Sequence, residues 1–169
     1  PLGAGSDRLV SIEGVRATNS NDILLGHGTL ASRLYGEGGN DDITGGQGAD
    51  LLHGGSGNDT IRAGAGDTVE GSTGTDRVII SGTATGIAVD LAIAGDQATG
   101  AGTIRLAGIE DLWTGAQDDT LFGNDLANEL RGQGGHDRLL GRDGHDRLYG
   151  GDGNDTLDGG AGNDSLDGG

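Results

Sequence analysis

Two consecutive nine-residue segments, 45–53 and 54–62, share one pattern of residue types. Glycine stands at positions 1, 2 and 4, aspartate at position 6, and a large aliphatic residue at position 8. Glycine admits backbone conformations with φ > 0 and lets carbonyl oxygens converge where a Cβ would interfere. The aspartate adds a carboxylate, so each segment offers the hard oxygen ligands that Ca²⁺ prefers. The pattern therefore predicts a calcium-binding turn that recurs every nine residues.

Short strands must hold these turns in place. Positions 7 to 9 of each segment are predicted to form a strand, in which side chains alternate so that only the aliphatic residue at position 8 points inward. Two segments then make one coil, with a strand on each face and a turn at each edge. Turns eighteen residues apart stack on the same edge, where we expect them to share a metal ion.

Copies of this pattern divide the chain into regions. The first block carries one extra residue near 26–35 and has lost one near 63–70, whereas the second has six uninterrupted units. In the second block leucine fills every inward position, namely Leu121, Leu130, Leu139, Leu148, Leu157 and Leu166. The predicted regions are a lead-in strand at 1–16 with Pro1-Leu2-Gly3 interpreted as a tag remnant, a first β-roll at 17–79, a β connector or cap at 80–113, and a second β-roll at 114–169.

Composition narrows the function classes. Acidic residues outnumber basic ones by 27 to 10, for a formal charge of −17, which argues against nucleic acid as a partner. Gly accounts for 39 residues and aromatic side chains for four, so an ordinary core is excluded and the chain is expected to be disordered unless its carboxylates are neutralised. The sequence has no cysteine and no apolar run of membrane-spanning length, and no N-terminal signal peptide is expected in it.

The tandem nonapeptides resemble the RTX, or haemolysin-type, calcium-binding repeats of bacterial proteins exported by the type I pathway. The resemblance covers 17–79 and 114–169. It implies an all-β, right-handed parallel β-roll, with two rolls joined by the connector. It also implies export of an unfolded chain from a low-calcium cytosol, extracellular localisation, and folding where calcium is abundant. The implied partners are the type I secretion machinery and an attached effector domain, and the chain itself is expected to be a monomer.

The resemblance assigns calcium ligands residue by residue, for roughly five to eight ions. The predicted carboxylate ligands are Asp41, Asp50, Asp59, Asp67, Asp76, Asp119, Asp137, Asp146, Asp155 and Asp164, with Asp22 as a further candidate. The predicted turn glycines are Gly46, Gly48, Gly55, Gly57, Gly151, Gly153, Gly160 and Gly162. The expected bridges join Asp41 with Asp59, Asp50 with Asp67, Asp59 with Asp76, Asp119 with Asp137, Asp137 with Asp155, and Asp146 with Asp164.

Several positions depart from the pattern. The residues that do so are Glu37 and Arg142 at the second glycine, Ser32 and Asn128 at the aspartate, and Ala63 at the first glycine. We expect these edges to bind calcium weakly or not at all. His136 and His145 stand at position 5 on opposite edges, where their imidazoles are expected to face water. The chain stops inside a repeat, without the secretion signal that the resemblance implies, so the natural protein is expected to continue beyond Gly169.

Two functions remain open at this point. The first is a calcium-responsive folding and secretion module attached to an effector. The second is an adhesion or polysaccharide-binding module that uses the outer face of the roll, with Trp113 as a sugar platform or, more simply, as a cap for the second roll. Mixed residue types at the outward position 7 favour the first. The motifs G-x-S-x-G, H-E-x-x-H and the P-loop are absent from the sequence, so no enzymatic activity is expected of these residues.

Overall fold

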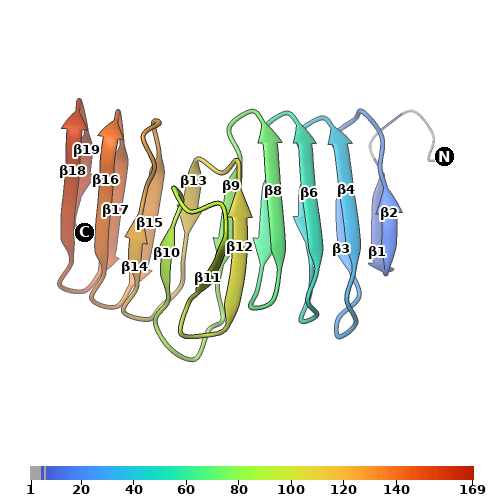
Figure 1. Cartoon of the computed structure of the whole chain (residues 1–169), viewed down its shortest axis with the longest axis horizontal. Coiled ribbons are helices and arrows are strands. Elements are labelled where there is room, and N and C mark those ends of the chain that lie inside the picture. Colours follow the sequence, from blue (N-terminus) through green and yellow to red (C-terminus); the bar gives the residue numbers. More distant parts are fainter. Residues whose placement is uncertain (1–4, 6) are drawn as a thin grey trace. The chain divides into compact units, whose positions relative to one another are not determined.

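The computed structural model describes Gly5 and residues 7–169, so the tag remnant expected at Pro1-Leu2-Gly3 lies outside the described residues. All regular elements in the described part are β-strands. Among these residues there is no helix with the length and hydrophobicity needed to cross a membrane. The chain folds into two compact units, one with residues up to Ile79 and Ile104–Ile109, the other with Ile80–Thr103 and Glu110–Gly169. In each unit the strands run side by side and are joined by turns (Figure 1).

The first unit is built from two parallel sheets. Their strand orders are β1-β3-β5-β7-β9 and β2-β4-β6-β8-β12, so successive strands up to β9 alternate between the sheets. Paired residues lie one coil apart, as in Ile43 with Ile61 and Leu34 with Leu52. The strands are β1 (Arg8–Ile12), β2 (Gly14–Arg16), β3 (Ile23–Gly26), β4 (Arg33–Gly38), β5 (Asp42–Thr44), β6 (Leu51–Ser56), β7 (Thr60–Ala63), β8 (Thr68–Thr73), β9 (Arg77–Ile80) and β12 (Thr103–Ala107).

The second unit repeats this arrangement. Its strand orders are β13-β15-β17-β19 and β10-β14-β16-β18, and the pairs Leu130 with Leu148 and Leu121 with Leu139 keep the eighteen-residue spacing. Each unit is therefore the parallel β-solenoid that the nonapeptide pattern predicted. The strands are β10 (Ala88–Asp90), β11 (Asp96–Ala98), β13 (Asp111–Trp113), β14 (Thr120–Phe122), β15 (Glu129–Gly134), β16 (Arg138–Gly144), β17 (Arg147–Asp152), β18 (Thr156–Gly162) and β19 (Ser165–Asp167).

The core of each unit is a ladder of position-8 side chains. Because side chains alternate along a strand, one aliphatic residue per strand points between the two sheets. Nine of these residues are at most 1% exposed, namely Leu24, Leu34, Ile43, Leu52, Ile61, Leu121, Leu130, Leu139 and Leu148. The ladder loosens in the last coil, where Leu166 is 48% exposed.

Segment 80–113 contributes strands to both units. The segment forms β10 and β12, among other strands. Leu106 of β12 pairs with Val69 of β8 in the first unit, and Val89 of β10 pairs with Leu121 of β14 in the second. Each of these four side chains is at most 1% exposed. The segment therefore extends the cores of the rolls and does not build a core of its own.

Candidate metal centre

Aspartates line the edges of the coils in hydrogen-bonded rows. The backbone N–H of Asp41 donates to Oδ1 of Asp59, and the N–H of Asp59 donates to Oδ1 of Asp76, both at 2.8 Å. The same bond joins Asp50 to Asp67, Asp119 to Asp137 and Asp137 to Asp155 at 2.8 Å, and Asp146 to Asp164 at 2.9 Å. All six expected Asp pairs are thus neighbours along an edge. Their role as calcium ligands stays a prediction.

The second carboxylate oxygen of many of these residues has no partner. Oδ2 is buried and accepts no hydrogen bond from the described part of the chain in Asp41, Asp50, Asp59, Asp137, Asp146 and Asp155. A buried anionic oxygen without a partner is strongly unfavourable. We therefore expect each of these oxygens to meet a cation, and a carboxylate oxygen is a ligand that Ca²⁺ prefers.

The turn glycines create the space around these oxygens. A Cβ on Gly54 would overlap Oδ2 of Asp59, and a Cβ on Gly57, whose φ is +125°, would overlap the carbonyl oxygen of Gly39 in the preceding coil. The other predicted glycines lie as closely against a backbone carbonyl group of the preceding coil, namely Gly46, Gly48, Gly55, Gly151, Gly153, Gly160 and Gly162. Carbonyl groups of successive coils therefore line up beside the carboxylates.

This arrangement suits a hard cation better than a transition metal. Among the described residues, no group of three or more His, Cys, Asp or Glu side chains converges on one point. A site in these turns must therefore combine one or two carboxylates with main-chain carbonyls. An all-oxygen set of this kind fits Ca²⁺, which accepts six to eight oxygen ligands in flexible geometry.

Burial makes these carboxylates difficult to ionise without a metal. Burial raises the pKa of Asp41, Asp67 and Asp137 to about 6, and hydrogen bonds from backbone N–H groups oppose this rise only in part. The charges of neighbouring aspartates in the same row raise these pKa values further. Burial also raises the pKa of Asp59 and Asp146. Folding without a metal therefore makes these carboxyls harder to ionise than they are in the unfolded chain.

In calcium-stripped buffer, the raised pKa values should make the fold less stable as the pH rises. The pKa of Asp41 in the fold, about 6, lies above the ordinary value of 3.8. Its contribution to the stability of the metal-free fold is thus fully present below about pH 4 and is lost as the pH rises through about 6. We expect circular dichroism to show more metal-free β-structure at pH 4.5 than at pH 7, and Asp41→Asn to weaken this pH dependence in part, because the other buried aspartates remain. More β-structure at pH 7 would contradict the prediction.

Two predicted ligands differ from the rest because their Oδ2 atoms are already hydrogen-bonded. Oδ2 of Asp22 accepts bonds from the backbone N–H and the hydroxyl of Thr18, both at 3.0 Å. Oδ2 of Asp67 accepts one from the N–H of Gly64 at 2.7 Å. The turn before Asp67 is one residue short, which brings that N–H within reach of the carboxylate. At Ser32, which replaces an aspartate, the hydroxyl accepts a bond from the N–H of His27 at 3.0 Å.

Asp7 belongs to the same rows but was missed in the sequence. Its N–H donates to Oδ1 of Asp22 at 2.5 Å, as in the pairs above. Its Oδ2 is buried and has no hydrogen-bond partner among the residues described. The signal was present, because Asp7 precedes Leu9 by two residues, the spacing that separates positions 6 and 8. Gly3 and Gly5 also stand at positions 2 and 4 of this unit, and only the first glycine is replaced, by Leu2.

A second row of hydrogen bonds runs through the side chains at position 5. Nδ1 of His136 accepts a bond from the N–H of Asn154, and Nδ1 of His145 from that of Asn163, both at 2.9 Å. Both histidines are exposed, as expected, and each imidazole also accepts a hydrogen bond from the next coil. Side-chain oxygens at position 5 accept equivalent bonds in Asn21, Asn40, Asn58 and Asp118. This row holds successive turns together without a metal.

Trp113 is the last residue of β13, and it is partly exposed. The guanidinium of Arg131 stacks 4.5 Å from the centre of its ring and 4.3 Å from that of Tyr149. The indole Nε1 donates to Glu129 at 3.1 Å. One face of the indole is thus covered by Arg131, which leaves less of the ring open to a sugar.

Glycine–aspartate turns stacked on a parallel β-solenoid define a calcium-binding β-roll. The profile of the RTX calcium-binding nonapeptide repeat matches the chain four times, at 35–69, 106–139, 113–148 and 140–169. These matches cover more than half of the chain, which belongs to this family. Calcium is accordingly the ion that its repeats bind. A comparison with curated proteins gives no match.

Proposed function

We propose that this chain is a calcium-dependent folding module, disordered without Ca²⁺ and ordered when the ion binds between successive coils. The buried Oδ2 atoms of seven aspartates, Asp7 included, lack partners among the described residues and carry this proposal. At neutral pH the metal-free fold would hold rows of like charges at its edges, and burial would oppose their ionisation. A bound Ca²⁺ replaces the repulsion with attraction, so binding free energy becomes folding free energy.

The proposed ligands are the aspartate rows and the glycine-lined carbonyls. Each ion would bridge two aspartates of one row, as in the pair Asp41 and Asp59 or the pair Asp137 and Asp155. Their backbones are already joined by hydrogen bonds of 2.8 Å. Roughly five to eight ions would then bind. The lower figure applies if no ion binds at Asp22 and Asp67, whose Oδ2 atoms are already hydrogen-bonded.

The coupling of calcium binding to folding also suggests where the protein folds in the cell's surroundings. RTX repeat proteins are typically secreted by bacteria, and extracellular calcium lies in the range that weak sites need. We propose that the module stays unfolded during type I export and folds outside the cell, where it stabilises an attached effector. We propose a non-catalytic role, because in the pocket of about 370 Å³ beside β10 one of the two lining acids, Asp90, is engaged in an ion pair with Arg142; Asp96 is the other.

Calcium removal tests the proposal. In EGTA at pH 7, circular dichroism should report a disordered chain. Added Ca²⁺ should restore β-structure cooperatively at about 10⁻⁴–10⁻³ M, the range of extracellular modules. Mg²⁺ should not replace it, because Mg²⁺ demands tight octahedral geometry. A chain that keeps its full β-signal in EGTA at pH 7 would contradict the proposal.

A further inference from the structure

We infer that side-chain donors take the place of a calcium ion at one junction on one edge of the second unit, between the turns that end at Asn128 and Asp146. This inference rests on the proposed function, since it concerns which junctions the ions fill. Two residues carry it, Asn128 at position 6 and Arg142 at position 2, and both depart from the repeat pattern.

Asn128 occupies the aspartate position without needing a cation. Like the aspartates, it donates its backbone N–H to the next residue in the row, Asp146, at 2.9 Å. Its side-chain oxygen accepts a bond from the N–H of Asn124 at 2.8 Å, and its Nδ2 donates to the carbonyl of Glu110 at 2.9 Å. Both ends of this buried amide are therefore satisfied within the protein, and the side chain has no negative charge to offer a metal.

Arg142 places a positive charge at the same junction. Its Nη1 donates to the carbonyl oxygen of Gly123, the position-1 glycine of the preceding coil on this edge, at 2.8 Å. The residue adopts φ +81°, a left-handed conformation that favours glycine. The strain of a side chain at this position is thus accompanied by a hydrogen bond to a turn carbonyl. Where position 2 is a glycine, no side chain is available to donate a hydrogen bond to this carbonyl.

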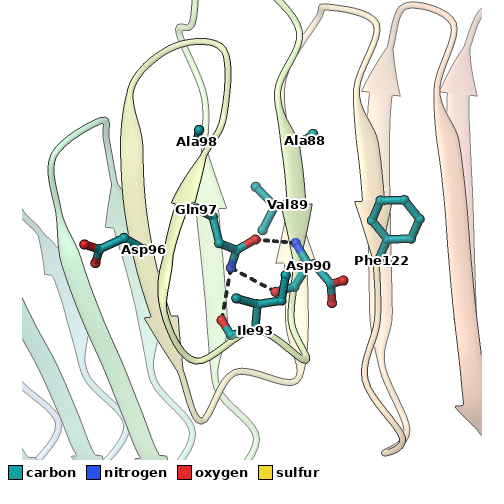
Figure 2. A pocket seen from close by; sticks show the side chains of 8 residues that line it. All are labelled: Ala88, Val89, Asp90, Ile93, Asp96, Gln97, Ala98 and Phe122. Carbon is teal, nitrogen blue, oxygen red and sulfur yellow. Dashed lines mark hydrogen bonds between the residues drawn. The ribbon is translucent and has the colours of Figure 1, made fainter.

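The guanidinium is held in place from its other side. Nη1 and Nη2 donate to the two carboxylate oxygens of Asp90 at 2.8 and 2.7 Å, a two-point ion pair whose partners are 29% and 19% exposed. Figure 2 shows how Gln97 fixes Asp90: its amide accepts a bond from the N–H of Asp90 at 2.7 Å and donates to its carbonyl at 2.9 Å. The charge of Arg142 is therefore fixed by the segment that carries β10.

The opposite edge has a related contact. Gln133, also at position 2, has φ +74° and donates its Nε2 to the carbonyl of Thr114, position 1 of the preceding coil. One coil beyond Arg142 the pattern changes, because position 2 is Gly160 and Oδ2 of Asp146 accepts no bond from a described residue. On the Arg142 edge the junction between Asn128 and Asp146 is thus closed by side chains, and calcium is needed from Asp146 onward.

Restoring the repeat pattern by mutation tests whether these side chains take the place of a calcium ion. Bound calcium is counted by native mass spectrometry at saturating Ca²⁺, for the wild type and for Asn128→Asp, Arg142→Gly and the double variant. The double variant should bind one ion more than the wild type. Asn128→Asp alone should gain none, because the guanidinium still blocks the junction, and Arg142→Gly alone should gain none, because the carboxylate is missing. Arg138→Gln, which removes a charge elsewhere, is the control and should leave the count unchanged.

The outcomes separate this inference from the proposed function. A folded double variant with the wild-type count would overturn the inference, whereas a wild type that binds no calcium would overturn the proposed function instead. If the double variant does not fold, anomalous diffraction from calcium-grown wild-type crystals decides. A calcium peak between Asp146 and Asp164, with none between Asn128 and Asp146, supports the inference, and a peak at the latter junction refutes it.

Discussion

Asp59→Asn should raise the calcium concentration at the folding midpoint by about tenfold or more, equivalent to losing roughly 1.4 kcal/mol of binding. Asp59 is 2% exposed and belongs to two expected bridges, one with Asp41 and one with Asp76. Asparagine keeps the Oδ1 acceptor of the row but removes the charge, and Asn128 shows that an amide fits at position 6. The fold should therefore survive at high calcium, with up to two ions fewer bound.

Asp42→Asn is the matched control for this experiment. It removes the same charge one residue from Asp41, but its side chain is 44% exposed and paired with Arg62 on the surface. An exposed ion pair contributes about 0–1 kcal/mol, so the calcium midpoint should hardly move. Equal shifts for Asp42→Asn and Asp59→Asn would mean that overall charge, and not the buried row, sets calcium affinity.

The second large effect is expected at a turn glycine. Gly46→Ala should destabilise the first unit by roughly 2–4 kcal/mol at saturating calcium, as measured by chemical denaturation. Gly46 has φ +119°, and a Cβ there would overlap the carbonyl oxygen of His27 in the preceding coil. The substitution thus combines backbone strain with a steric overlap between two coils, and either coil must move.

Gly64 provides a control on the same edge, one coil further along. A Cβ on Gly64 would lie 3.8 Å from the carbonyl oxygen of Gly46 and 4.0 Å from Oδ2 of Asp67, which are ordinary contacts. Gly64→Ala should therefore be neutral or stabilising by about 0.4–1 kcal/mol, because alanine restricts the unfolded chain. If the two substitutions cost the same, the close approach of carbonyls to the turn glycines does not stabilise the roll.

Much of the fold could be predicted from the sequence because its contacts follow the repeat. A position-8 residue meets the position-8 residue one coil away, so Ile43 beside Ile61 and Leu130 beside Leu148 could be inferred from spacing alone. The six aspartate pairs followed from the same spacing, even for Asp50 with Asp67 and Asp59 with Asp76, which the shortened turn brings to seventeen residues apart. Stacked repeats contact only their neighbours, which makes the sequence period a direct measure of spatial adjacency.

The contacts that sequence analysis missed depend on local turn geometry or on long separations. The acceptor role of Nδ1 in His136 required the path of the turn one coil later, since position 5 carries several residue types. The hydrogen bond from the N–H of Gly64 to Oδ2 of Asp67 depended on which residue of the shortened turn faces the carboxylate. The ion pair of Arg142 joins it to Asp90, 52 residues away and outside the repeats, where the repeat period gives no register.

The position of the calcium ions tests the central claim most directly. Anomalous diffraction from crystals grown in calcium should place ions between turns of successive coils on the same edge, such as Asp41 with Asp59 and Asp137 with Asp155. The Ca–O distances should be about 2.3–2.6 Å to Oδ2 atoms and turn carbonyls. Ions held within a single turn, or bridging residues nine apart such as Asp50 and Asp59, would contradict the account.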